Sequence, residues 1–320
     1  MTFEGQAQLP KLPIPELEDT CSSYLRTLQP LVSEEALAKS KAAVARFLEA
    51  EGPELQQQLR SYAADRASYI EDYWLDAYLQ GNSSVVLNIN PYFVLEDDPT
   101  PSNNDQISRA ASLVVSALEF YSLLKREELP ADDWRGTPLC MNQYRSLFGC
   151  TRMPSEGRDT IEAHPDSRHI LVLAHGRLYY FDAIWSDGSL AVTEEQMRTN
   201  LELIVEDASA GAKSVGDDES LAASIGVLTS EARSAWHQLR RELCLVPENA
   251  ASLSLIDSAL FVLCLDDDSP DSPEAVARTM LHGSYAMQRG VQVGSRRKPI
   301  GDLNHHHSPL RPTAPSTPPH

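Results

Sequence analysis

Apolar residues recur at helical spacing along much of the chain. Leu37, Val44 and Leu48 share one face of a predicted helix that ends near residue 50. Ser33 stands where its hydroxyl can cap the first turn, and Gly52 is a plausible stop signal. Further helices are predicted over residues 54–79, 105–125, 193–206, a stretch after Thr229 that carries Trp236, and 273–281.

Short apolar runs rich in β-branched residues predict buried strands. Two of them flank His175, Gly176 and Arg177, which indicates a β-hairpin with a tight turn. The runs cover residues 85–89, 170–174, 178–184, 225–228 and 259–265. Because helices alternate with these strands, the pattern predicts an α/β or mixed-sheet architecture.

The two ends of the chain lack this patterning. Residues 1–16 are spaced by prolines and predict an extended arm. Residues 284–320 hold one acid, five Arg or Lys, six prolines and a run of three histidines at 305–307, which predicts disorder. The histidine run could bind a metal ion, but we favour an ordinary low-complexity tail. We therefore expect an arm over 1–16, an incomplete folded domain over 17–283 and a disordered tail over 284–320.

Charge and composition narrow the class of protein. The formal net charge of −19 repels phosphate backbones, so no nucleic-acid partner is expected. No run approaches 18 consecutive apolar residues, so no membrane span is predicted. The first 15 residues resemble neither a secretory signal nor a transit peptide. The expected compartment is the cytoplasm, with a mitochondrial or peroxisomal location left open.

The cysteine pattern argues against a disulfide framework. Five cysteines are present, an odd number, and no CxxC pair occurs among them. They are predicted to be reduced thiols, mostly buried. A catalytic cysteine is the alternative, and no local motif supports it. No metal-ligand spacing is found, so no metal site is predicted.

The run from Leu9 to Pro15, with Asp19, Thr20 and Tyr24, is the first of several blocks that resemble the choline/carnitine acyltransferase family. Later blocks lie at residues 73–79, 138–148, 150–159, 169–172, 181–182, 187–188, 226–229 and 280–283. Residues 85–91 and 95–101 resemble the fungal branch of carnitine acetyltransferases. The blocks follow the family order over about residues 9–283.

The resemblance implies a fold, an activity and a site. The fold would be the N-terminal half of the carnitine acyltransferase fold, an α/β arrangement of many helices around a mixed sheet. The activity would move an acyl group from a coenzyme A thioester, a co-substrate rather than a tightly bound cofactor, to carnitine or another small hydroxyl acceptor. Trp74, Asn88 and Tyr92 would line the substrate tunnel. From the residues alone, Trp74 and Tyr78 are more simply read as core.

The family's general base has no match in the chain. In the family, a histidine within a Glu-His motif deprotonates the acceptor hydroxyl, a task that suits a neutral imidazole. None of the nine histidines follows a glutamate, and His282 matches a family histidine that is not the catalytic one. The family's coenzyme A lysines and a Gly-rich phosphate loop are also without a match. No catalytic or cofactor-binding residue is therefore predicted.

Three interpretations stay open. The chain could represent an acyltransferase whose gene product is longer, or one that acts on an unusual acceptor in fungal specialised metabolism. It could be a truncated, inactive relative, since the composition changes at residues 283–284 as it would after a frameshift, a retained intron or a misplaced gene boundary. It could also be an acidic scaffold, which explains the charge alone. A half fold would expose apolar surface and is expected to self-associate.

Overall fold

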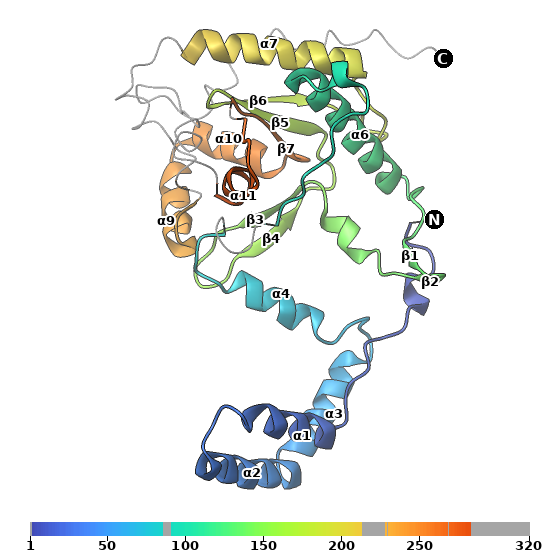
Figure 1. The fold of residues 1–320 in the computed structure, drawn as a ribbon, viewed down its shortest axis with the longest axis vertical. Helices are drawn as coiled ribbons and strands as arrows, with labels where there is room; N and C mark the ends of the chain where they lie inside the picture. The colour runs from blue at the N-terminus through green and yellow to red at the C-terminus, as the bar shows by residue number, and fades with distance from the viewer. Residues whose placement is uncertain (1, 86–90, 213–227, 229, 268, 283–320) are drawn as a thin grey trace. The chain divides into compact units, whose positions relative to one another are not determined.

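The computed structural model describes residues 2–85, 91–212, 228, 230–267 and 269–282. The chain divides into two compact units. Unit 1 comprises Met1–Phe3, Leu79–Ala131 and Met141–His320, and unit 2 comprises Glu4–Tyr78 and Asp132–Cys140. Figure 1 shows a sheet wrapped by helices in unit 1 and a helical hairpin cluster in unit 2. The mixture of helices with a small mixed sheet confirms the predicted fold class.

Unit 2 is built mainly from helices. A 3-10 turn, η1 (Gln6–Gln8), precedes an arm that carries no helix or strand through residue 16. The helices are α1 (Leu17–Leu28), α2 (Glu34–Glu49), α3 (Gly52–Ala63) and α4 (Glu71–Leu79), whose last residue belongs to unit 1. The short strands β1 (Asp133–Trp134) and β2 (Thr137–Pro138) form an antiparallel pair. The first three helices pack against one another.

Two local signals in unit 2 have a clear physical basis. The Ser33 hydroxyl accepts a hydrogen bond from the Ala36 backbone N–H, which confirms the predicted cap of α2. The helix ends before Gly52, as expected. Gly52 then begins α3, and a Cβ there would lie only 2.7 Å from the Phe47 carbonyl oxygen and 2.8 Å from a Leu17 methyl. Glycine is needed at this position because two helices approach closely there.

The single helix predicted over residues 54–79 is wrong. The structure breaks it between Ala63 and Glu71, where side chains replace helical hydrogen bonding. The Arg66 guanidinium lies 3.8 Å from the Tyr62 ring centroid and donates to the Tyr62 carbonyl. The Tyr62 hydroxyl donates to Asp72 across the break at 2.7 Å. These side-chain contacts supply hydrogen bonds that the backbone would supply in a continuous helix. The apolar pattern of this segment does not require the helix to continue.

The sheet of unit 1 has three strands in the order β6-β5-β7. Strand β5 (His169–Ala174) runs antiparallel to β6 (Arg177–Asp182) and parallel to β7 (Val262–Leu265). The hairpin is therefore confirmed. Its turn places His175 at φ 44° and Gly176 at φ 77°, the left-handed values of a two-residue hairpin turn. The central strand is buried along nearly its whole length, as expected for a strand covered on both faces.

Helices surround this sheet. They are α6 (Gln106–Lys125), α7 (Glu194–Ala212), α9 (Arg233–Leu243), α10 (Pro247–Asp257) and α11 (Pro273–His282). A second hairpin joins β3 (Cys150–Met153) to β4 (Thr160–Ala163), and short 3-10 turns, η2 (Pro101–Asn103) and η3 (Asn142–Ser146), complete the unit. Helices α6 and α7 pack on each other and on the sheet, and their buried faces form the centre of the core.

Helix α6 is the most buried helix of the core. Ala111, Val114 and Leu118 have at most 3% of their surface exposed. Among the described residues it is the one helix whose length and apolar composition would also suit a membrane span, and its packing against the sheet accounts for that composition. Asp105 caps its first turn. Hydrogen bonds from Ser108 hold the pKa of this carboxyl below its ordinary value.

Some predicted segments cannot be compared. The strands predicted at 85–89 and 225–228 lie almost entirely outside the described residues, as does the tail 284–320. The strand predicted at 259–265 is shorter, because β7 begins at Val262. The five cysteines are all free, as predicted, but the expectation that most are buried is wrong. Only Cys21 is buried, Cys150 is half-buried, and Cys140, Cys244 and Cys264 are exposed.

Candidate functional site

The residues predicted to line a substrate tunnel fall in different parts of the molecule. Trp74 lies on α4 in unit 2, and Tyr92 is a half-buried residue of unit 1. Asn88 lies outside the described residues. The tunnel assignment of these three residues therefore stays a prediction.

The reading of Trp74 and Tyr78 as core residues is wrong. Trp74 is 63% exposed and Tyr78 is 44% exposed, and their rings pack on each other at 5.7 Å between centroids. Residues 71–75, 77 and 78 of α4 are all exposed, so the helix offers these aromatic residues no buried face. The sequence pattern could not predict the exposure of Trp74 and Tyr78, because an aromatic pair at helical spacing can be buried or exposed.

Two of the described histidines contact backbone carbonyls. His169 is buried and its Nε2 lies 2.8 Å from the Leu255 carbonyl oxygen. His237 Nδ1 lies 3.0 Å from the Pro154 carbonyl oxygen. His175 differs, because its two ring nitrogens contact two side chains, those of Ser209 and Asp267. The side chain of His282 lies outside the described structure.

The most buried charges of unit 1 converge on Asp159. Its Oδ2 accepts from Arg152 Nε at 2.7 Å and from Arg233 Nε at 2.6 Å. Its Oδ1 accepts from the Ser155 backbone N–H at 3.2 Å, and its own N–H donates to the Leu79 carbonyl at 2.9 Å. The side chains of Asp159 and Arg233 are 1% and 6% exposed. One carboxylate thus pairs with two guanidinium groups largely away from solvent.

This network joins segments that are distant in the sequence. Arg152 lies on β3, Asp159 just before β4, and Arg233 at the first residue of α9. Asn82 adds a cap to α9, because its carbonyl accepts from the Arg233 backbone N–H and its side-chain oxygen accepts from that of Ser234. The carboxylate oxygens are fully engaged by donors of the chain, so the cluster is suited to holding the hairpin and α9 together rather than to proton transfer.

The stretch 150–159 contributes to the family resemblance, but the sequence alone predicts no role for Asp159. The one local indication of an ion pair was that Arg152 and Asp159 lie on either side of a turn-rich segment. The third member, Arg233, lies 74 residues further along, and no local pattern connects it to Asp159.

Unit 2 contains a cavity of about 240 Å³ between the arm and the end of α3. Its lining includes the cations Lys11, Arg60 and Arg66 beside Tyr69 and small apolar residues. Each cation already has a partner. Lys11 donates to the Ala64 carbonyl, Arg60 pairs with Glu16 and Arg66 pairs with Asp65. The paired cations make a poor phosphate cradle, and no cluster of three metal-ligating side chains occurs among the residues that the structure describes.

Comparisons with known proteins identify the class. The family model for choline/carnitine O-acyltransferases matches residues 12–298. The chain is 34% identical to human mitochondrial carnitine O-palmitoyltransferase 2, with 88% of this chain and 46% of that protein aligned. It is 33% identical to bovine peroxisomal carnitine O-octanoyltransferase, covering 90% of this chain and 48% of that protein. The chain belongs to the choline/carnitine acyltransferase family. It spans about half the length of these relatives and covers the family fold in part.

Proposed function

We propose that this chain supplies part of an acyltransferase that moves an acyl group from acyl-coenzyme A to the hydroxyl of carnitine or another small acceptor. The observation that carries the proposal is the family match over residues 12–298. Coenzyme A enters as the acyl donor, a co-substrate of this family, and no tightly held cofactor is invoked. Trp74, Asn88 and Tyr92 are proposed to contact the acceptor or its acyl chain.

The proposal places the general base outside this sequence. No histidine of the chain follows a glutamate, and the side chains of His169 and His237 bond to backbone carbonyls. The consecutive residues Phe93, Val94 and Leu95 are 84%, 68% and 62% exposed, an apolar surface that suits coverage by further acyltransferase structure. A second copy of the chain is the other candidate to cover it.

A second candidate function is an inactive acyltransferase-like protein. The lack of a Glu-His motif in the sequence favours it. Sequencing the transcript across residues 275–320 separates the two. A reading frame that continues in the family pattern supports the active enzyme, and a transcript that encodes the proline- and histidine-rich segment and then stops supports the inactive relative.

Two finer proposals concern context. The likeness of residues 85–101 to the fungal carnitine acetyltransferases leads us to propose a fungal-type enzyme, with specialised metabolism as one setting for an acceptor other than carnitine. The compared relatives are named as mitochondrial and peroxisomal, so these two organelles stand beside the cytoplasm as proposed compartments. The high negative charge again argues against nucleic acid as a partner.

The proposal is tested with a chimera. Residues 2–282 are joined to the part of bovine peroxisomal carnitine O-octanoyltransferase that this chain does not cover, and release of free coenzyme A is followed with and without carnitine. We expect carnitine-dependent release, lost by a factor of about 10²–10⁴ when the histidine of the Glu-His motif in the bovine part is replaced by alanine. A folded chimera that releases no coenzyme A in response to carnitine would count against the proposal.

A further inference from the structure

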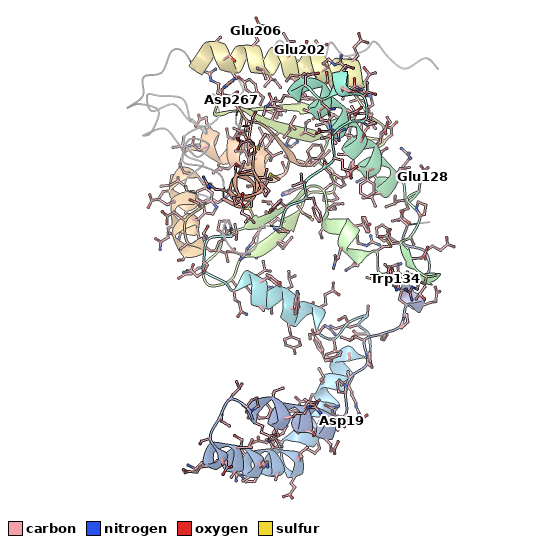
Figure 2. The ribbon with its side chains drawn as sticks, in the orientation of Figure 1. Asp19, Glu128, Trp134, Glu202, Glu206 and Asp267 are labelled. Carbon is pink, nitrogen blue, oxygen red and sulfur yellow. The ribbon has the colours of Figure 1, made fainter. Side chains whose placement is uncertain are left out.

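Three chemically complementary side chains meet at one end of the unit 1 sheet. Ser209 lies in the last turns of α7, His175 lies in the β5–β6 turn, and Asp267 follows β7 by two residues. In Figure 2 the labelled Asp267 lies beneath α7, at the edge of the sheet. The residues come from separate elements, so their meeting is a product of the fold rather than of the local sequence.

The contacts between them have a definite order. Ser209 Oγ lies 3.1 Å from His175 Nε2, and His175 Nδ1 lies 3.1 Å from Asp267 Oδ2. A carboxylate can only accept, so the proton of a neutral imidazole is held on Nδ1. Nε2 is then free to accept the Ser209 hydroxyl hydrogen. This order of serine, histidine and aspartate is the arrangement that activates a serine oxygen as a nucleophile.

The imidazole is held in place by its surroundings. Strand pairing of Ala174 with Arg177 closes the turn, and His175 takes a positive φ that a residue with a side chain adopts rarely. Two further contacts attach the hairpin to α7, the helix that carries Ser209. The Tyr179 hydroxyl donates to Asp207 at 2.7 Å, and Arg177 pairs with the same carboxylate at 3.8 Å. Burial and the bond to Asp207 raise the pKa of Tyr179, so this donor keeps its proton.

We propose that Ser209, His175 and Asp267 form a serine acyl-hydrolase site with Ser209 as nucleophile, His175 as general base and Asp267 as positioning residue. Ser209 is half-buried, and the side chains of His175 and Asp267 are 24% and 78% exposed, so all three residues have some contact with solvent. The substrate class is a small activated acyl ester or thioester, which needs no enclosing pocket. The inference does not rest on acyl transfer to carnitine, because neither the acceptor nor the family's Glu-His base takes part.

The chemical step uses only the substrate and water. The Ser209 oxygen bonds to the acyl carbon while its proton passes to His175 Nε2. The bond from that carbon to the alcohol oxygen or the thiol sulfur breaks, and the leaving group takes the proton from Nε2. Water then attacks the acyl-serine, giving its proton to Nε2, which returns it to Ser209. The products are a carboxylic acid and a thiol or alcohol, and the serine is restored.

Covalent labelling tests the nucleophile. A fluorophosphonate probe reacts with an activated serine by forming a P–O bond and releasing fluoride. We expect labelling of the full chain at Ser209, identified by mass spectrometry of peptides, and its loss in Ser209→Ala. Ser258→Ala is the matched control, since the Ser258 hydroxyl donates to the Ser254 carbonyl and has no imidazole partner. No labelling of the native chain, or labelling that Ser209→Ala leaves unchanged, overturns the proposal.

Hydrolysis of p-nitrophenyl acetate tests the base and the positioning residue. We expect His175→Ala to lower the rate by about 10²-fold or more, with partial recovery on adding free imidazole. Asp267→Asn is expected to lower it only about tenfold, because water can replace so exposed a carboxylate. Recovery by imidazole separates a chemical role from a structural one. A rate that His175→Ala leaves intact, in a variant with native circular dichroism, refutes the assignment.

Discussion

Replacing Asp159 by asparagine is expected to lower the free energy of unfolding of unit 1 by about 3–5 kcal/mol. The substitution keeps the shape but removes the negative charge that pairs with Arg152 and Arg233. Arg233 is 6% exposed and Arg152 is 17% exposed, so water cannot solvate either guanidinium well. An asparagine also replaces one carboxylate oxygen by an NH2 group. Both oxygens of Asp159 accept N–H donors, so a donor would then face a donor. The measurement is chemical denaturation followed by far-UV circular dichroism and by tryptophan fluorescence, to which the buried Trp236 contributes.

Asp182→Asn is the matched control. Asp182 pairs with Arg168 at 3.4 Å, and both side chains are about half exposed, at 50% and 47%. Solvent screens such a pair, so its loss should change stability by about 0–1 kcal/mol. Equal effects of the two substitutions would show that the buried network around Asp159 does not hold the hairpin to α9.

Leu118→Ala is expected to destabilise unit 1 by about 2–5 kcal/mol. Leu118 is fully buried at the centre of α6, in the cluster that joins this helix to α7 and the sheet. Truncation removes apolar contacts and leaves a cavity that rigid neighbours cannot fill. Equilibrium denaturation of the variant gives the free energy directly.

Leu245→Ala controls for the loss of the same atoms. Leu245 lies between α9 and α10 and is 82% exposed, so its truncation should cost less than about 0.5 kcal/mol. A Leu118→Ala protein as stable as Leu245→Ala would mean that α6 is not packed as the structure has it.

Local chemistry accounts for the parts of the fold that could be predicted. The Ser33 cap and the hairpin around His175 each depend on a few adjacent residues, and the structure confirms both. The position of α6 follows from twenty residues of sustained apolar pattern. Each of these features depends on residues that are close together in the sequence, so the local pattern is sufficient to predict it.

Features that depend on distant residues could not be predicted in this way. The break between α3 and α4 arises because Arg66 stacks on Tyr62 and Tyr62 bonds to Asp72, contacts invisible to hydrophobic periodicity. The buried pair of Asp159 with Arg233 spans 74 residues. The contact of Ser209 with His175 spans 34 residues and depends on how α7 lies against the β5–β6 turn. The class of protein could be predicted from the resemblance to a family. The polar clusters could be identified only from contacts in the three-dimensional structure.

The most direct test of the central claim is an assay of the purified 320-residue chain with acetyl-coenzyme A and carnitine. The claim is that this sequence provides acyltransferase structure without the Glu-His base that activates the acceptor hydroxyl. We predict that carnitine adds nothing to the rate of coenzyme A release, whatever slow release Ser209 supports without an acceptor. Release that rises with carnitine concentration, with acylcarnitine as product, would contradict the claim, because the chain would then activate the acceptor hydroxyl without the Glu-His base.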